Sequence, residues 1–267
     1  MTSQPTFFIP HGGGPCFFME WTHGPADTWD DMKSWLSALS DTLAQQPGAI
    51  VVISAHWEEA AFTVSSGAHP SLIYDYYGFP DHTYELTYPA PGAPELAAQV
   101  ARLLSNAGLP TDTNDNRGYD HGVFIPFKVI FPTAQIPIVQ VSLHQSLDPA
   151  LHLQAGRALA PLRQHNILIV GSGMSYHNMA GFGDPGCRAS SEEFDQWLTE
   201  AVTKTSGRDE ALINWHQAPA ARTIHPREEH LIPLMVAAGA AGDDPCEKVF
   251  SGIAMDVALS AFRFTSA

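Results

Sequence analysis

Cysteine and basic residues are both scarce in this sequence. The three cysteines among 267 residues, Cys16, Cys187 and Cys246, form no CxxC pair. An odd number without that spacing argues against a disulfide framework and indicates a reducing compartment. Lys and Arg number 13 against 28 Asp and Glu, giving a formal net charge of −15. That balance argues against nucleic acid and against anionic membrane surfaces as partners.

Long apolar runs and targeting signals are also missing. The longest apolar run, residues 231–241, is about half of the roughly 20 residues that a membrane-spanning helix needs. The first five residues contain neither a basic region nor a long apolar stretch, so we expect no secretory signal. With 45% hydrophobic residues the chain can bury a sizeable core. We therefore expect a cytoplasmic protein with a single domain, residues 1–267.

Histidine, by contrast, is abundant. The chain has 13 histidines, as many as Lys and Arg together. Because histidine is the commonest metal ligand and the usual proton shuttle near neutral pH, this excess is the first indication of function.

Strand-like and helix-like segments alternate along the chain, and several of the strand-like segments end near a histidine. Apolar runs lead into His11, into His56 and, through two glycines, into His177. Pro226 suits the first position of a helix, which would place His230 near the start of that helix. The alternation predicts an α/β fold: a central, mostly parallel or mixed sheet with helices on both faces. Ligands bind such sheets beyond the carboxyl ends of the strands, where these imidazoles could converge.

Each of these histidines also has a purely structural interpretation. A lone histidine at a strand end is more often a hydrogen-bonded structural residue than a ligand, whereas three at similar junctions strengthen the case for a ligand set. Neutral imidazoles without a cysteine partner suit zinc, iron, copper or nickel. His121 follows Asp120, which could instead cap a helix. Glu229 could complement a helix dipole or act as a carboxylate ligand.

Two other stretches are predicted to shape a pocket. Gly12 and Gly13 allow a ligand to approach the main chain closely. Residues 66–94 are rich in Gly, Pro and Tyr and include Tyr76 and Tyr77. A long irregular segment within a compact domain is usually functional, and this many aromatic residues argue against disorder. We expect the segment to cover the pocket and to influence the choice of substrate.

Six motifs occur in one order along the chain and together resemble a known family. They are His11-Gly12-Gly13-Gly14-Pro15, Ser54-Ala55-His56-Trp57-Glu58, Tyr88-Pro89-Ala90-Pro91-Gly92, Asp120-His121-Gly122, Tyr176-His177-Asn178 and Glu229-His230-Leu231-Ile232-Pro233-Leu234. The chain resembles the class III extradiol ring-cleavage dioxygenases, in the branch of 4,5-DOPA extradiol dioxygenase. The resemblance implies the α/β fold of the catalytic subunit of protocatechuate 4,5-dioxygenase.

The resemblance also implies roles for individual residues. His11, His56 and His230 would hold a non-haem metal, and His177 would act beside it as acid and base or as a further ligand. His121 would be a second catalytic residue in the substrate pocket. The residues predicted to line that pocket are Gly12, Gly13, Trp57, Tyr76, Tyr77 and His225.

One feature departs from the usual non-haem iron site. Two histidines and one carboxylate are the usual ligands, and here His230 would replace the carboxylate. Iron(II) is expected for activity, while zinc(II) fits the same donors but has no redox chemistry. The expected substrates are a small catechol-type aromatic diol and O2. The resemblance is compatible with a homo-oligomer.

Two other functions could use the same histidines. In a zinc hydrolase the metal would activate water, with His177 or Glu58 as the base. Alternatively, the chain could be a non-catalytic protein of this fold that binds a metal or a partner. The complete histidine set favours an enzyme.

Overall fold

A single mixed sheet organises the computed structural model, which describes residues 3–204 and 206–266. Its strands are β1 (Thr6–Pro10), β2 (Ala49–Glu59), β3 (Phe62–Ser65), β4 (Thr111–Asn114), β5 (Ile138–His144), β6 (Ile167–Gly173), β7 (Cys246–Ala254) and β8 (Val257–Phe264). Their order across the sheet is β4-β3-β5-β2-β6-β1-β8-β7. The four central strands, β5, β2, β6 and β1, are parallel, and antiparallel pairs join them to β3 on one side and to β8 on the other.

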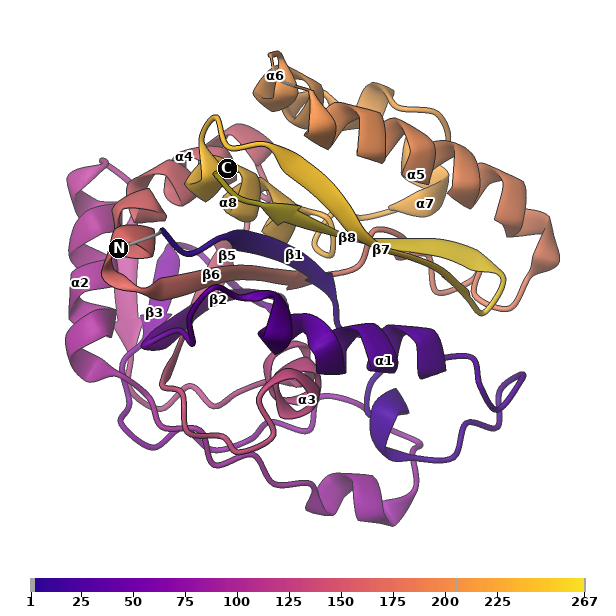
Figure 1. The fold of residues 1–267 in the computed structure, drawn as a ribbon, viewed down its shortest axis with the longest axis horizontal. Coiled ribbons are helices and arrows are strands. Elements are labelled where there is room, and N and C mark those ends of the chain that lie inside the picture. Colours follow the sequence, from indigo (N-terminus) through magenta and orange to yellow (C-terminus); the bar gives the residue numbers. More distant parts are fainter. Residues whose placement is uncertain (1–2, 205, 267) are drawn as a thin grey trace.

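Helices cover both faces of this sheet (Figure 1). The α-helices are α1 (Asp30–Leu39), α2 (Pro94–Asn106), α3 (His121–Ile130), α4 (Pro149–Leu159), α5 (Arg188–Thr203), α6 (Arg208–Ile213), α7 (Ala221–Ile224) and α8 (Ile232–Ala241). On one face α3 packs against β2 and β6, with α1 beside it. On the other face α8 packs against β6 and β1, with α4 over it and α5 against β8. The prediction of an α/β fold with a mixed sheet and two helical layers is confirmed.

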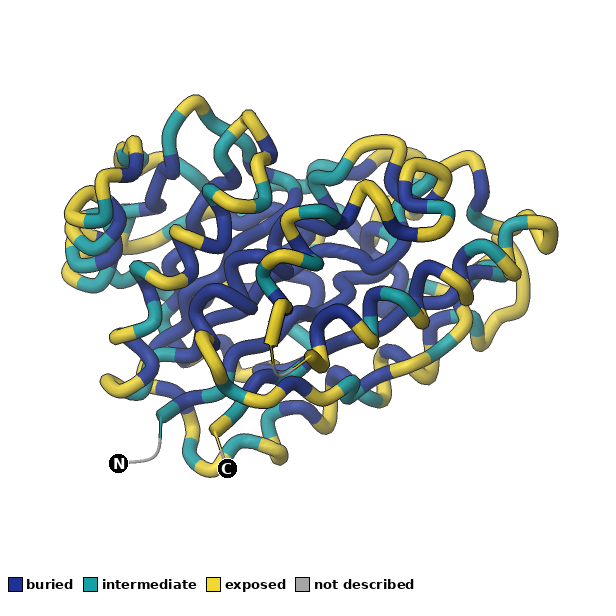
Figure 2. The backbone as a smooth tube through the Cα atoms, turned by 90° about the horizontal axis from the view of Figure 1, so that it is seen from above, coloured by how far each residue is buried: buried dark blue, intermediate teal, exposed yellow. Residues whose placement is uncertain are grey.

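The central strands are built from residues that suit burial on both faces. β1 and the first seven residues of β2 are wholly buried, as is most of β6, because helices cover them from both sides. Figure 2 shows this buried interior running through the middle of the molecule, with the exposed residues at its periphery. In the described part of the chain no helix is long and apolar enough to span a bilayer, and the apolar run at residues 231–241 forms the buried helix α8.

The parallel arrangement brings three strand ends to one edge of the sheet. β6 lies between β1 and β2 and is parallel to both, so the carboxyl ends of all three strands point the same way. His11 follows β1 directly, and His177 lies four residues beyond β6. The sheet topology therefore places these side chains where an open α/β sheet binds its ligands.

β2 continues past His56 instead of ending there, which corrects the expected boundary. Its pairing with β5 shifts between Ile53 and Glu58, so that residues 54–57 stand opposite the single residue Ser142. Such a bulge bends the strand and redirects a side chain, and bulges are common beside functional sites. His56 owes its direction to this irregularity.

The helix expected from Pro226 begins later, at Ile232, so His230 precedes the helix. The reason is a backbone bond to the end of β6: the Met174 N–H donates to the His230 carbonyl over 3.0 Å. A Cβ at Gly173 would lie 2.1 Å from that carbonyl oxygen, so only glycine permits this approach. Asp120 does precede α3, yet its side chain makes no capping bond.

One buried histidine away from this edge makes stability depend on pH. The Nδ1 of His152 lies 2.7 Å from the Asp148 carbonyl, and its Nε2 accepts the His144 N–H over 3.1 Å, so the ring is neutral. Burial lowers the pKa of His152 from 6.5 to about 4.

Because the unfolded chain takes up a proton at this residue before the folded chain does, the free energy of unfolding should fall as the pH drops from 6.5 towards 4. His152→Gln should reduce that slope by up to about 1.4 kcal/mol per pH unit. Urea unfolding of the metal-free protein across this range measures the slope, with His216→Gln at an exposed position as the control. Equal slopes in both variants would contradict the prediction.

Candidate metal centre and substrate pocket

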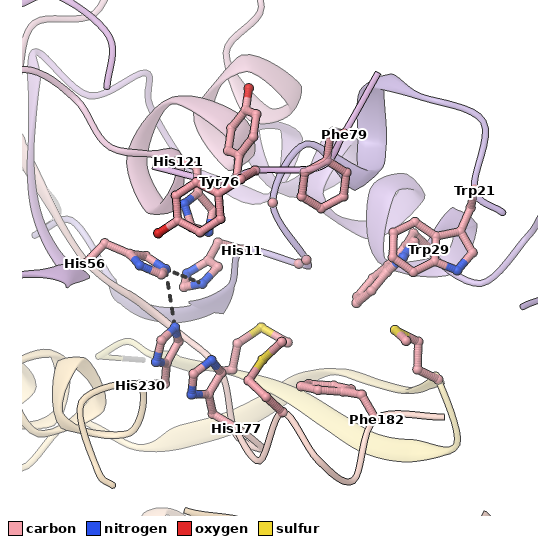
Figure 3. Close-up of a pocket in the computed structure, with 17 residues that line it drawn as sticks. His11, Trp21, Trp29, His56, Tyr76, Phe79, His121, His177, Phe182 and His230 are labelled. Carbon is pink, nitrogen blue, oxygen red and sulfur yellow. Dashed lines mark hydrogen bonds between the residues drawn. The ribbon is translucent and has the colours of Figure 1, made fainter. Parts of the chain in front are cut away.

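Five histidines from distant parts of the chain line one cavity of about 400 Å³ at the carboxyl edge of the sheet (Figure 3). They are His11 after β1, His56 on the bulge of β2, His121 at the start of α3, His177 beyond β6 and His230 before α8. The structure thus brings together every histidine predicted to act in catalysis or metal binding. Gly12, Gly13, Tyr76 and Tyr77 also line the cavity, as expected.

Three of these imidazoles direct their Nε2 atoms at one another. Nε2 of His56 lies 3.1 Å from that of His11 and 3.3 Å from that of His230, the two contacts dashed in Figure 3. His11, His56 and His230 can each offer a nitrogen within 4.8 Å of the others. That geometry suits a metal ion bound by three histidines.

In His11 and His230 the other ring nitrogen has a hydrogen-bond partner that sets the tautomer. Nδ1 of His11 lies 3.2 Å from the Ser172 hydroxyl, which itself donates to the Gly122 carbonyl. The serine oxygen is therefore left to accept, and the His11 proton belongs on Nδ1. Its Nε2 then carries a free lone pair.

Two carboxylates lie behind the remaining histidines. Asp75 lies 2.8 Å from Nδ1 of His121, and one oxygen of Glu229 lies 3.0 Å from Nδ1 of His230 and 3.1 Å from Nδ1 of His177. An ionised carboxylate can only accept, so these three rings carry their proton on Nδ1 and leave Nε2 bare. Nδ1 of His56 lies 3.6 Å from Asp75, which is a charge contact and too long for a hydrogen bond. Carboxylates commonly lie behind metal-binding histidines in this way.

Burial keeps the converging imidazoles neutral. Loss of solvent, followed by repulsion from the neighbouring imidazoles, lowers the pKa of His11 and of His230 well below the usual value. The same causes lower the pKa of His56 to about 4. Burial by itself raises the pKa of Asp75 and of Glu229, but hydrogen bonds from His121 and His177 outweigh it, and both values fall. Bare nitrogens backed by ionised carboxylates favour a cation.

His177 differs from the three converging rings. It stacks on His230 with ring centroids 3.3 Å apart and planes 16° apart, and it remains partly exposed to the cavity. Its Nε2 is free because Glu229 holds Nδ1. The ring can accept a proton from a bound molecule or contribute a further ligand.

A buried carboxylate supports the bulge that carries His56. Asp120 accepts hydrogen bonds from the Ser54 hydroxyl at 2.6 Å, from Arg117 at 2.7 Å and from Gln140 at 2.5 Å. The same serine hydroxyl accepts the His56 N–H, and Arg117 also donates to the His56 carbonyl. The position of the His56 backbone therefore depends on a charge that lies outside the cavity.

The irregular segment between β3 and α2 covers the cavity as expected. The ring of Tyr76 is buried and lies edge-on to His121, with centroids 5.9 Å apart. Its hydroxyl donates to the Thr83 carbonyl over 2.6 Å, so the ring and not the hydroxyl faces the pocket. Tyr77 is exposed at the rim.

Two residues predicted for the pocket lie outside it. Trp57, on the bulge of β2, does not line the cavity, and its indole N–H donates to Glu59 over 2.8 Å. His225 is fully buried in the interior, with Nε2 3.1 Å from the Ser175 carbonyl, and burial lowers its pKa to about 3. The prediction that Trp57 and His225 line the pocket is therefore wrong, because both side chains make their hydrogen bonds outside the cavity.

Several residues of the site have roles that the sequence does not indicate. The role of Asp75 was not predicted, although it is an acid within a run of tyrosines. Glu229 was given a helix-dipole or ligand role, whereas it bonds to two imidazoles. Glu58, considered as a base, forms a two-pronged ion pair with Arg227 and does not line the cavity. The cavity-lining residues that were not selected are Gly14, Trp21, Trp29, Phe79, Met174, Met179, Phe182 and Met255.

A protein-family model also matches this chain. The family is described as the catalytic LigB subunit of aromatic ring-opening dioxygenase, and the match covers residues 5–258.

Characterised relatives match over most of the chain. Dioxygenase tasH of Hapsidospora irregularis is 42% identical over 274 residues, covering 93% of this chain and 81% of the relative. The 4,5-DOPA dioxygenase extradiol of Beta vulgaris is 37% identical, covering 90% of this chain and 88% of the relative. The protein of that name from Escherichia coli is 32% identical, with coverage of 95% and 92%.

A solved structure has the same fold. The crystal structure of an uncharacterized protein from Escherichia coli K12 superposes with a TM-score of 0.78 at 29% identity, covering 98% of this chain and 99% of the other.

Because three ring nitrogens converge and His177 lies beside them, substitutions at these positions should affect metal binding and turnover differently. His56→Ala should lower metal occupancy, because it removes one of three donors. His177→Gln should keep the metal yet lower turnover by roughly 100-fold or more, the usual effect of losing a general acid or base. Metal content per chain, measured beside the turnover of each variant, checks both statements. Loss of metal in His177→Gln would instead make His177 a ligand.

Asp120→Asn should destabilise the fold by about 3 kcal/mol or more, because it leaves the Arg117 cation without its buried partner. It should also lower metal affinity, since the backbone of His56 loses its support. Urea unfolding and metal titration measure the two effects, with Asp243→Asn at an exposed position as the matched control. An Asp120→Asn protein as stable as the control would contradict the argument.

Proposed function

This chain belongs to the family of catalytic LigB subunits of aromatic ring-opening dioxygenases, and from that premise we propose that it opens a catechol-type ring at a metal held by His11, His56 and His230. The enzyme class itself is plain: the chain is an extradiol ring-cleaving dioxygenase that acts on an aromatic substrate and O2. The metal ligands, the metal and the particular diol are the parts we propose.

The single observation that carries the proposal is the convergence of three Nε2 atoms. Nε2 of His56 lies only 3.1 and 3.3 Å from those of His11 and His230, whose lone pairs are bare, so the three nitrogens can share one cation. Neutral imidazoles are ligands for iron and for zinc alike. The residues present therefore fit a divalent transition metal.

We propose iron(II) as the metal in the active enzyme. Held by His11, His56 and His230, it would supply Lewis acidity towards the diol and redox chemistry towards O2. Zinc(II) fits the same donors but has no redox chemistry, so it should give a loaded and inactive protein. The three-histidine set lacks the carboxylate of the usual facial triad. Asp75 and Glu229 supply negative charge from behind the ligands instead.

His177 is proposed to move the proton. Its bare Nε2 faces the cavity and can take a proton from a diol hydroxyl, while the Glu229 carboxylate stabilises the imidazolium that forms. His121 is proposed to orient the substrate, because Asp75 fixes its ring and Tyr76 lies against it. The diol and O2 together contain all the atoms of the product. A ring bond adjacent to the hydroxyl carbons breaks, and no outside reductant is needed.

The remaining expectations concern the domain organisation, location, partners and assembly of the enzyme. We propose that residues 1–267 act as one catalytic domain, of which residues 1–2, 205 and 267 lie outside the described structure. The three cysteines are free, which supports a reducing, cytoplasmic location. The acidic balance of the chain makes nucleic acid and anionic membranes poor partners. Assembly as a homo-oligomer stays a prediction.

Oxygen uptake tests the proposed function. Protein reconstituted with iron(II) should consume one O2 per catechol and release a yellow ring-opened product, whereas zinc-loaded protein should do neither. An oxygen electrode and absorbance spectroscopy follow the two together, with iron-treated His56→Ala as the control for unspecific oxidation. Turnover by the zinc form without oxygen uptake would indicate a hydrolase and refute the proposal.

A further inference from the structure

The cavity has two chemically different ends. The five histidines form one end, while Trp21, Trp29 and Phe182 lie at the other, with Phe79 along the wall between them (Figure 3). A diol bound at the histidines would therefore direct its ring substituent towards the aromatic residues. A volume of about 400 Å³ lies in the range of pockets that enclose a drug-sized ligand, and it leaves room beyond a single ring.

The aromatic end offers no charge to a substituent. Among the residues that line the cavity in the described chain there is no Asp, Glu, Lys or Arg. An amino-acid group carries both an ammonium and a carboxylate, and burying either without a partner is costly. The formal net charge of −15 adds a long-range repulsion against any carboxylate on the substrate.

The indole walls at this end present carbon. Trp21 and Trp29 are buried and pack edge to face, with centroids 5.5 Å apart. A Cβ built on Gly13 would meet Cζ2 of Trp29 at 3.3 Å and Cη2 of Trp21 at 4.0 Å, so the carbon edges of both indoles face that part of the lining. Met174 and Met255 also line the cavity, and thioether side chains adapt to apolar and aromatic groups.

The rim of the same cavity is apolar as well. Tyr77 is 87% exposed and Met179 is 72% exposed, the highest values among the large hydrophobic side chains of the described chain. Both line this one cavity. Single exposed apolar residues are common, but two on one rim mark a surface that is covered when a ligand binds.

We propose, resting on the ring-opening function above, that the catechol substrate carries an uncharged apolar or aromatic substituent that lies against Trp21, Trp29 and Phe182. The proposed substrate differs from DOPA, for which some relatives are named, because the ring substituent of DOPA carries an amino-acid group. An amine-bearing catechol is the rival occupant, because aromatic faces attract cations. It is disfavoured here because an ammonium would lose its water without meeting a carboxylate.

Binding to the zinc-loaded protein tests the substrate class, since zinc does not consume the ligand. Calorimetry should give a dissociation constant for 4-phenylcatechol roughly 10- to 100-fold lower than for L-DOPA or for dopamine, as expected from burying one more aromatic ring. Equal or tighter binding of L-DOPA or dopamine overturns the inference, and so does the absence of binding by all three. A missing oxygen uptake with iron would instead refute the ring-opening function and leave this preference measurable.

A charge placed at the aromatic end gives a second test. Phe182→Arg should weaken binding of 4-phenylcatechol at least tenfold and strengthen binding of L-DOPA, while Ile213→Arg, at an exposed position outside the cavity, should change neither. Phe182 lies in a loop and is only partly buried, and Ile213 is exposed, so the fold should tolerate both changes. Metal content equal to that of the parent protein verifies this. An unchanged preference in Phe182→Arg would overturn the assignment of the substituent to this end.

Discussion

The structure depends on one geometric constraint: the Nε2 atoms of His11, His56 and His230 meet at one point of the cavity. His11 and His230 hold their protons on Nδ1, towards Ser172 and Glu229, so their Nε2 lone pairs face His56, which has the carboxylate of Asp75 behind it. Burial keeps the rings of His11 and His230 from becoming charged. We propose that a cation at the common centre stabilises this arrangement.

The neutral rings are supported by carboxylates that lie behind them, farther from the common centre of the Nε2 atoms. Asp75 and Glu229 each serve two histidines, so each carboxylate links a proposed ligand to a proposed catalytic ring. Asp120 acts one step further back, through the backbone of the β2 bulge. In the proposed metal centre, which has no carboxylate ligand, these carboxylates would offset the charge of a divalent metal.

The pocket joins this polar centre to an apolar chamber, and the division matches the chemistry of the enzyme class. An aromatic diol has a polar edge for the metal and a ring that gains from contact with apolar walls. The loop bearing Tyr76 closes over the polar end, where exclusion of water strengthens electrostatic interactions. The segments bearing Trp21 and Phe182 enclose the other end, and variation in such loops is the usual way for one scaffold to accept different substrates.

The sequence alone determined the α/β class, the histidines at the strand ends and the family, because strand periodicity and motif order are local features that survive without coordinates. The sequence did not correctly predict the positions of Trp57 and His225 or the first residue of α8. These depend on the direction of a side chain and on which backbone groups form hydrogen bonds. Only the tertiary structure decided that Asp75 and Glu229 stand behind the imidazoles, and that residues near Trp21 and Phe182 form one wall. Apart from that of Glu229 with its neighbour His230, these contacts join separate segments of the chain, and parallel pairing of β1, β6 and β2 is what brings such segments to a single edge.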